Sequence, residues 1–331
     1  HQLLYKTGLL KSVTFNVPVI SVGNLSVGGA GKTPHVEYLI RLLKDYINVA
    51  TLSRGYKRKT KGFRIAHPRN TAEDVGDEPL QYKRKYADVV VSVAESRVMA
   101  VPEIMKFFPD TQTILLDDAF QHRAINPGLN ILLTEYNHPF TDDFLMPAGR
   151  LREWRSNYKR ADIIIVSKCP PTLVEAEKEK WINKINPLPH QRLFFSYYAY
   201  GLPYYIFNPR FRGHLKDDID ILLVCAIARS EYLISYLEEQ VNSIVLLEFE
   251  DHHYFTKQDM SAIRATYERM DSKRKVIITT EKDAMRLDLH REFLVEHKLP
   301  VYALPVQVQF HFNEGLIFNQ TVQNFLLEFK V

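Results

Sequence analysis

The chain has 331 residues, 46% of them hydrophobic and 25% charged, with 43 Lys and Arg residues against 39 Asp and Glu residues. This length exceeds the size at which a single hydrophobic core usually keeps growing, so we expect two domains. The net charge of +4 is too small to indicate a nucleic-acid partner, and no apolar run reaches the roughly eighteen residues needed to cross a bilayer. Cys169 and Cys225 lack metal-ligand spacing and are expected to be buried thiols.

The first stretch of the chain, residues 3–15, mixes apolar and aromatic residues with Lys6 and Lys11. This composition is typical of a helix that lies in a membrane interface. Packing of the same side chains against the body of a domain explains the pattern equally well. A membrane-associating N-terminal segment is therefore an expectation that the structure has to test.

A glycine-rich loop follows the apolar run 17–24 and precedes a helical pattern. Backbone N–H groups of such a loop bind phosphate oxygens, Lys32 can reach the β and γ phosphates, and the Thr33 hydroxyl can bind Mg²⁺. A glycine-rich turn with an incidental lysine is the alternative, and Ser26 stands where the general pattern has glycine. The residues predicted to bind the nucleotide are Ser26, Val27, Gly28, Gly29, Ala30, Gly31, Lys32 and Thr33.

Two alternations of strands and helices predict an α/β fold. Apolar runs at 47–52, 88–93, 113–118, 130–135 and 161–169, with helical stretches between most of them, favour a parallel sheet covered on both faces. A second alternation has strands at 219–228, 243–248, 275–280 and 301–304. The aromatic run between them predicts paired linker strands. We therefore expect a phosphate-loop domain over residues 1–192, a two-stranded linker over 193–213, and a smaller α/β domain over 214–331.

Two carboxylates end the predicted strand at 113–118. In open α/β sheets ligands lie at the carboxyl ends of strands, and Asp117 or Asp118 is placed where a phosphate-loop enzyme holds Mg²⁺. Neighbouring side chains of a strand face opposite ways, so both can serve the metal only if the strand ends between them. Turn or capping carboxylates are the alternative.

Asp77 lies at the predicted start of a helix, and His252 follows a strand of the second domain. Capping alone explains Asp77, but a kinase also needs a group that accepts or orients the proton of the attacking hydroxyl. The adjacent His252 and His253 make a poor metal chelate, so one of the two is more plausible as an orienting partner of a catalytic carboxylate than as a metal ligand. A purely structural role for this histidine has similar weight.

A basic group is formed by Arg150, Arg152, Arg155, Lys159 and Arg160. With Arg97, it is suited to a phosphorylated acceptor or to an anionic membrane surface. A solvated surface run is the ordinary alternative.

Taken in order, seven segments resemble the tetraacyldisaccharide 4'-kinase family, which phosphorylates the lipid A precursor with ATP. They span residues 23–34, 53–56, 76–79, 117–122, 147–153, 251–253 and 280–284. Each segment alone is a weak indication of the family, but the ordered set is specific and covers nearly the whole chain. Ser26 in place of the glycine of the general phosphate loop is usual in this family. The resemblance implies two α/β domains joined by a two-stranded linker, with catalysis beside the phosphate loop.

The resemblance also implies roles for individual residues. Asp77 is implied as the base toward the 4'-hydroxyl and His252 as its assistant. Lys32 and Thr33 are implied to hold phosphates and Mg²⁺, with Asp117 and Asp118 serving the metal and the active-site network. The residues implied to line the acceptor or nucleotide site are Arg97, Arg152, Glu153 and Gln121.

ATP, Mg²⁺ and an acylated disaccharide 1-phosphate lipid are the implied ligands. The implied location is peripheral, on the cytoplasmic face of a bacterial inner membrane, with no nucleic acid and no obligatory protein partner. A phosphate-loop kinase of a water-soluble hydroxyl metabolite is one rival. A nucleotide-dependent switch protein is another, because Lys168 and residues 280–283 faintly resemble guanine-reading signatures, although neither has the usual order.

Overall fold

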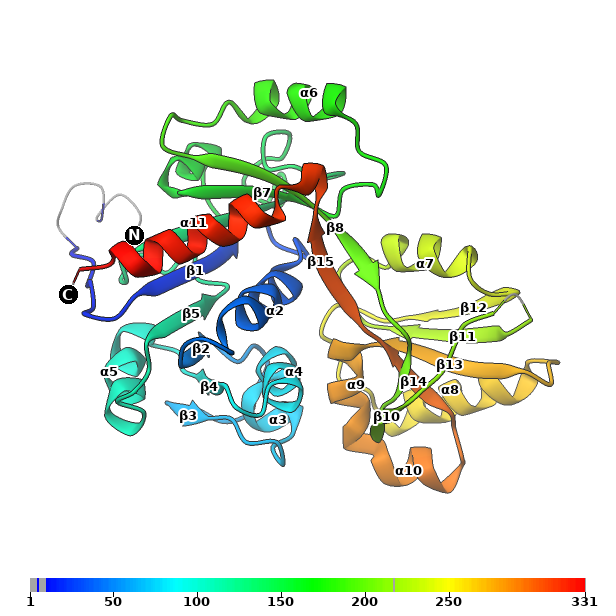
Figure 1. The fold of residues 1–331 in the computed structure, drawn as a ribbon. Coiled ribbons are helices and arrows are strands. Elements are labelled where there is room, and N and C mark those ends of the chain that lie inside the picture. The colour runs from blue at the N-terminus through cyan, green and yellow to red at the C-terminus, as the bar shows by residue number, and fades with distance from the viewer. Residues whose placement is uncertain (1–4, 6–9, 217, 331) are drawn as a thin grey trace.

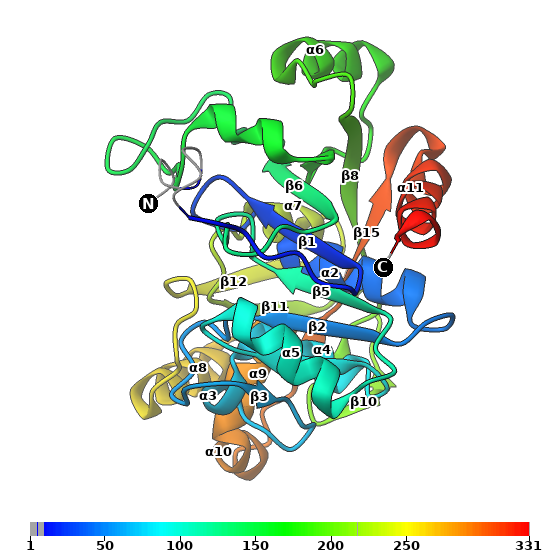
Figure 2. The same cartoon turned by 90° about the vertical axis from the view of Figure 1, so that its left-hand side faces the viewer.

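The computed structural model describes residue 5, residues 10–216 and residues 218–330. Two sheets organise these residues, as Figure 1 shows, and the view in Figure 2 is turned by 90°. The larger sheet has nine strands in the order β15-β8-β7-β6-β1-β5-β2-β4-β3, and the smaller has six in the order β10-β9-β14-β13-β11-β12. The two predicted α/β alternations are therefore present.

The nine-stranded sheet contains β1 (Val19–Asn24), β2 (Val49–Ser53), β3 (Arg64–Ile65), β4 (Val90–Val93), β5 (Thr113–Asp117), β6 (Leu129–Glu135), β7 (Ile163–Ser167), β8 (Arg192–Tyr200) and β15 (Val306–Phe310). The six-stranded sheet contains β9 (Tyr204–Tyr205), β10 (Asn208–Arg212), β11 (Asp220–Cys225), β12 (Ser243–Glu248), β13 (Lys275–Thr280) and β14 (Val301–Leu304). Each sheet has a parallel centre with antiparallel strands at an edge.

The helices that belong with the larger sheet are α2 (Lys32–Leu43), α3 (Ala72–Val75), α4 (Asp77–Lys85), α5 (Arg97–Phe107), α6 (Glu175–Ile185) and α11 (Gly315–Glu328). Those of the second domain are α7 (Glu231–Glu238), α8 (Lys257–Arg269), α9 (Glu281–Leu287) and α10 (Arg291–Glu296). Short 3₁₀ turns lie at Arg155–Arg160, Asp288–His290 and His311–Asn313.

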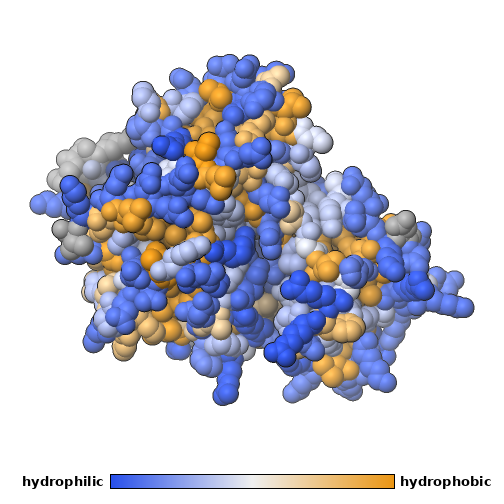
Figure 3. All heavy atoms as spheres, in the orientation of Figure 1, coloured by the Kyte–Doolittle hydropathy of each residue, from blue (hydrophilic) through white to orange (hydrophobic). Residues whose placement is uncertain are grey.

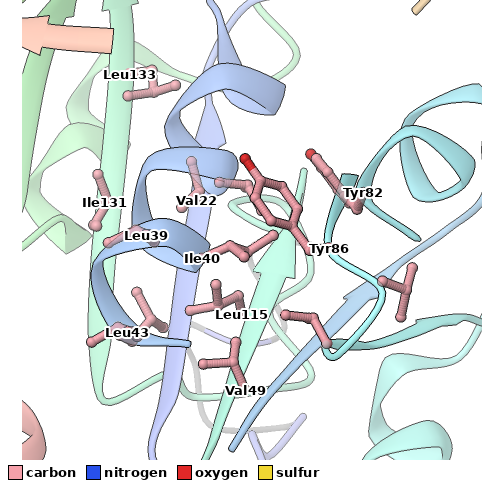
Figure 4. Close-up of a cluster of buried hydrophobic side chains, with 14 of the residues drawn as sticks. Val22, Leu39, Ile40, Leu43, Val49, Tyr82, Tyr86, Leu115, Ile131 and Leu133 are labelled. Atoms are coloured by element: carbon pink, nitrogen blue, oxygen red, sulfur yellow. The ribbon is translucent and has the colours of Figure 1, made fainter. Parts of the chain in front are cut away.

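The central strand β1 is buried along its whole length, because helices cover both faces of the sheet. Ile20 and Val22 belong to the cluster under α2, whereas Val19 packs in the cluster under α5. This alternation follows from the two-residue period of a strand. Figure 4 shows the α2 cluster, where Leu39 and Ile40 contribute the apolar stripe of the helix.

The connection between the domains differs from the predicted pair of strands within residues 193–213. Strand β8 pairs antiparallel with β15, with Ser196 opposite Phe310 and Tyr200 opposite Val306. Strands β9 and β10 belong to the second sheet instead. A two-stranded connection is therefore present, but its second strand comes from a part of the chain about one hundred residues further on.

The predicted boundary of 214–331 for the second domain needs the same correction. After β15 the chain continues into α11, which lies beside β1 and α2 in Figure 1. Phe318 and Val322 of α11 are buried in the same cluster as Val22. The last part of the chain returns to the first domain because its apolar face completes that core.

Contacts between α4 and α9 hold the second domain against the first. Lys85 of α4 lies 2.6 Å from Glu37 and 2.7 Å from Glu281, so one ammonium group joins both domains. Arg84 pairs with Asp288 at 2.7 Å. Because α4 begins at Asp77, these ion pairs also fix the position of that carboxylate relative to the second domain.

The predicted membrane-associating segment lies largely outside the described residues, which leave out 1–4 and 6–9. Within its described part, the Val13 N–H donates to the Ala124 carbonyl at 2.8 Å, and Phe15 packs against the cluster under α5. Among the described residues, no helix has the length and apolar character required to cross a bilayer.

Candidate active site

A cleft of about 800 Å³ lies between the two domains, at the carboxyl ends of the parallel strands. Its walls come from the phosphate loop, from the ends of β2 and β5, and from the second domain at residues 227–233, 251–252 and 280–282. In Figure 3 hydrophilic side chains gather in the hollow between the two lobes. A cleft with this lining is suited to a charged ligand.

The phosphate loop connects β1 to α2 and needs glycine at two positions. Gly28 has φ of 112° and Gly31 has φ of 83°, a backbone region that side chains disfavour. Gly31 caps α2, whose first residues are Lys32 and Thr33. The N-terminus of α2 opens onto this loop, a geometry that can bind an anion, and nucleotide binding by residues 26–33 stays a prediction.

Lys32 and Asp118 face each other across the loop. The ammonium group of Lys32 lies 3.6 Å from Asp118 and donates to the side-chain oxygen of Asn24 at 3.3 Å. Arg152 donates to both carboxylate oxygens of Asp118, at 3.2 and 2.9 Å. Burial raises the pKa of Asp118, but the charges of Lys32 and Arg152 more than reverse this and hold that pKa well below its usual range.

Asp117 and Asp118 both line the cleft. Strand β5 ends at Asp117, and Asp118 has a positive φ of 47°, so the alternation of a strand does not turn the two side chains to opposite faces. Asp117 is buried, accepts a hydrogen bond from the Tyr82 hydroxyl at 2.9 Å, and keeps its other oxygen without a partner among the described residues. Burial, together with the negative charges of Glu78 and Asp118, raises the pKa of Asp117 to about 7. The unpartnered oxygen of Asp117 is therefore a candidate ligand for a cation.

Asp77 and His252 are brought together from opposite domains. The ring Nδ1 of His252 lies 3.0 Å from Asp77 Oδ2, and the ring Nε2 accepts from the ammonium group of Lys282 at 2.9 Å. Because an ammonium group can only donate, Nδ1 carries the proton of the neutral ring and donates it to Asp77. Lys282 thereby fixes the tautomer of His252.

Lys282 and a second cation, Arg286, set the charge of Asp77. Burial raises its pKa, but Lys282, the hydrogen bond from His252 and the guanidinium group of Arg286 together hold the pKa below the usual range. Arg286 is fully buried and lies 3.5 Å from Asp77. Asp77 is thus ionised at neutral pH, which is the state required of a proton acceptor.

Glu78, the neighbour of Asp77, reaches the phosphate loop. Its carboxylate accepts from the Thr33 hydroxyl at 3.2 Å and lies 3.4 Å from Lys282. Glu78 and His252 line the cleft, whereas Asp77 is buried immediately behind them. The first turn of α4 therefore places two carboxylates beside the loop, one exposed to the cleft and one covered.

The residues predicted to bind an acceptor separate into two groups. Arg97, Gln121 and Arg152 line the cleft. Glu153 is buried and accepts from Gln121 and Arg160, at 2.9 Å each, and from Asn157 at 2.8 Å. Glu153 thus supports the cleft wall through Gln121 instead of facing it.

Three participants were not predicted as site residues from the sequence: Glu78, Lys282 and Arg286. Their signals are present, since Glu78 and Lys282 belong to segments that resemble the kinase family. Residues 280–283 faintly resemble a guanine-reading signature, but the structure places Lys282 against His252 and Thr280 at the N-terminus of α9. Arg286, one turn further along α9, carries no local signal.

The comparisons with known proteins identify the family to which the chain belongs. The family model described as "Tetraacyldisaccharide-1-P 4'-kinase" matches residues 1–325. A tetraacyldisaccharide 4'-kinase of Bacteroides fragilis is 43% identical, with 98% of this chain and 88% of the relative covered. One of Flavobacterium johnsoniae is 40% identical, with 95% and 90% covered. A crystal structure of LpxK from Aquifex aeolicus in complex with ATP is similar with a TM-score of 0.72 and 28% identity, covering 98% of this chain and 93% of that one.

Proposed function

Because the chain belongs to the tetraacyldisaccharide 4'-kinase family, we propose that it transfers the γ-phosphoryl group of ATP to the 4'-hydroxyl of a tetraacyldisaccharide 1-phosphate, a step of lipid A biosynthesis. The observation that carries this proposal is the hydrogen bond between Thr33 and Glu78, at 3.2 Å. It joins the phosphate loop to the helix turn that supplies Asp77. The loop that would bind the donor phosphates is thereby held next to Asp77, which lies immediately behind the cleft wall.

Residues 26–33 bind the triphosphate in this proposal, and Lys32 neutralises charge on the transferred group. Phosphoryl transfer requires mainly positioning and charge stabilisation from the protein, because its transition state is loose. The crystal structure of the similar Aquifex aeolicus protein is a complex with ATP, which supports ATP as the nucleotide in this proposal. Asn24 and Asp118 keep the Lys32 side chain in place.

Asp77 accepts or orients the proton of the acceptor hydroxyl, and His252 holds its carboxylate. We assign this role to Asp77 over Glu78 because Lys282, His252 and Arg286 keep Asp77 ionised, whereas Glu78 is engaged with Thr33. A modestly basic carboxylate is sufficient, since little proton transfer accompanies a loose transition state. Arg97, Gln121 and Arg152 lie where they can contact the acceptor or the phosphates.

The donor set of Thr33, Asp117 and Asp118 fits Mg²⁺. Carboxylate and hydroxyl oxygens are ligands that this ion prefers, and one oxygen of Asp117 is buried without a partner among the described residues. The described residues contain no group of three acidic, His or Cys side chains that could hold a metal by itself. When bound, Mg²⁺ supplies positive charge to the phosphate oxygens.

A multi-acyl acceptor stays in a bilayer, because each buried CH₂ group contributes about 0.8 kcal/mol. We therefore place the protein peripherally on the cytoplasmic face of the inner membrane, where ATP is available. Its partners are the acceptor lipid and the membrane surface.

The test is transfer of label from γ-labelled ATP to detergent-dispersed tetraacyldisaccharide 1-phosphate in the presence of Mg²⁺. Label should appear in the lipid, and Lys32→Ala should lower turnover by at least about a hundredfold. Lys106→Ala, a substitution at an exposed position of α5, is the matched control and should leave turnover unchanged. Absence of transfer by folded, ATP-binding protein would reject the acceptor, and near-normal turnover of Lys32→Ala would reject the role of Lys32.

A further inference from the structure

One loop of the first domain exposes three large apolar side chains. In the loop of residues 142–155, Phe144 is 62% exposed, Met146 is 59% exposed and Trp154 is 65% exposed. Single exposed apolar residues are normal on a protein surface, but several on one loop mark a binding surface. In Figure 2 this loop, drawn in green, projects from the first domain.

Backbone hydrogen bonds keep the 142–155 loop in one shape. Leu151 donates to the Phe144 carbonyl at 2.8 Å, Met146 donates to the Leu151 carbonyl at 3.1 Å, and Gly149 donates to the Leu145 carbonyl at 3.1 Å. The exposed side chains are therefore presented by an ordered turn. Apolar side chains held exposed by an ordered turn are typical of a surface that a partner covers.

The charges around these side chains favour an anionic partner. The acidic groups of the loop are engaged within the protein: Asp142 lies 2.5 Å from Lys184, and Asp143 accepts from the Arg150 N–H at 3.0 Å. The guanidinium group of Arg155 lies over the Phe144 ring, 5.0 Å from its centre. Lys159 follows in the adjacent turn and is exposed. Indole and phenyl rings next to Arg and Lys are the composition of a membrane-interface contact.

The inner side of the same loop is bonded to the phosphate loop. The Val27 N–H donates to the Arg150 carbonyl at 2.7 Å, and the Arg152 N–H donates to the Leu25 carbonyl at 2.8 Å. The Arg152 side chain then reaches Asp118. A surface that rests on lipid at Phe144 and Met146 is thus continuous with the wall of the cleft.

We propose that the 142–155 loop docks the protein on an anionic lipid bilayer, with Phe144, Met146 and Trp154 entering the interfacial layer. The choice of a bilayer rests on the proposed function, because a lipid acceptor must be met at a membrane. Docking at this loop holds the mouth of the cleft against the surface from which the acceptor headgroup rises.

The two tryptophans of the chain give a direct test. Trp154 is exposed and Trp181 is buried, so Trp181→Phe leaves Trp154 as the single reporter. Vesicles of phosphatidylethanolamine and phosphatidylglycerol should shift the Trp154 emission to the blue, and brominated acyl chains should quench it. High salt should weaken the effect, because anionic lipid attracts the basic side chains. Vesicle binding without blue shift or quenching would place the contact on another surface and overturn the proposal.

Paired variants complete the test. Phe144→Ser with Met146→Ser should weaken vesicle binding about tenfold or more, because two apolar side chains are lost from the interface. The matched control is Leu316→Ser with Leu327→Ser, two exposed positions of α11, which should bind within twofold of the unaltered protein. Equal binding by both pairs would contradict the proposal, provided that both melt cooperatively like the unaltered protein.

Activity separates this proposal from the proposed function. The Phe144 and Met146 pair should turn over detergent-dispersed acceptor within twofold of the unaltered protein but lose rate when the acceptor is diluted in vesicles. Quenching of Trp154 without any lipid phosphorylation would support docking and reject the kinase assignment. A dimer in sedimentation velocity that disappears in the loop variant, with Trp154 already blue-shifted in the absence of vesicles, would identify a second copy as the occupant and overturn the bilayer.

Discussion

Replacing His35 by Gln should flatten the pH dependence of folding stability. His35 lies on α2, one turn after the end of the phosphate loop, and is buried. Its Nδ1 is 2.7 Å from the Gly31 carbonyl oxygen and its Nε2 is 2.9 Å from the Ser196 hydroxyl. Because the carbonyl only accepts, Nδ1 carries the proton and Nε2 accepts from Ser196. The ring is therefore held neutral between the phosphate loop and β8.

The magnitude follows from the pKa of this ring. Burial lowers the pKa of His35 from 6.5 to about 4, with the Gly31 hydrogen bond opposing the change only in part. Between these two values the unfolded chain binds a proton that the folded protein does not. The stabilisation is therefore complete above pH 6.5 and is lost as the pH falls through 4. At about 1.4 kcal/mol for each pKa unit, the total loss is about 3 kcal/mol.

Urea unfolding at several pH values between 7.5 and 4.5 measures this effect. The unaltered protein should lose about 2.5 kcal/mol more free energy of unfolding over this range than His35→Gln. The variant should be less stable at pH 7.5, where the ring hydrogen bonds are intact, and the two curves should converge on acidification. Other titrating groups are common to both proteins and cancel. Parallel curves would refute the reasoning, because they would mean that His35 titrates equally in the folded and unfolded states.

Two further predictions concern the helix turn beside the phosphate loop. Asp77→Asn keeps the size of the side chain but removes its charge, so kcat should fall by about a hundredfold or more with little change in KM for ATP. Glu78→Gln should retain most of the turnover. The reverse order of the two variants in steady-state assays would assign the role of base to Glu78. Lys282→Met removes the strongest attractive charge on Asp77, so the pKa of Asp77 rises and the acidic limb of the kcat profile should move to higher pH than in the charge-preserving Lys282→Arg. Superimposable pH profiles for the two Lys282 variants would show that this ammonium group does not act on the ionised carboxylate.

The sequence was most informative where local pattern determines local structure. The strands at 243–248, 275–280 and 301–304 are found with the predicted bounds, because each is an apolar run in a parallel sheet. The phosphate loop was recognisable because its glycines and lysine are adjacent in the chain. Asp117 and Asp118 could be proposed because they lie at the carboxyl end of a buried strand.

Long-range pairing could not be read in the same way. The alternation of apolar and polar residues at 306–310 predicts a half-buried strand, but it does not indicate that this strand pairs with β8. The burial of Glu153 depends on Gln121, Asn157 and Arg160 meeting in three dimensions. Arg286 acts on Asp77 from a residue more than two hundred positions away. These relations arise from packing, which local propensity does not contain.

The pairing of β8 with β15 has a consequence for how the chain is made. Since the Gly201 N–H donates to the Pro305 carbonyl at 2.9 Å, the second domain leaves and rejoins the first through neighbouring strands, as an inserted unit does. During vectorial synthesis on the ribosome, the second domain can emerge whole while the first still lacks β15 and α11. The phosphate-loop domain therefore completes its core only when Phe318 and Val322 have been translated. A nascent chain arrested before these residues exposes the nucleotide domain, not the inserted one, to proteases and chaperones.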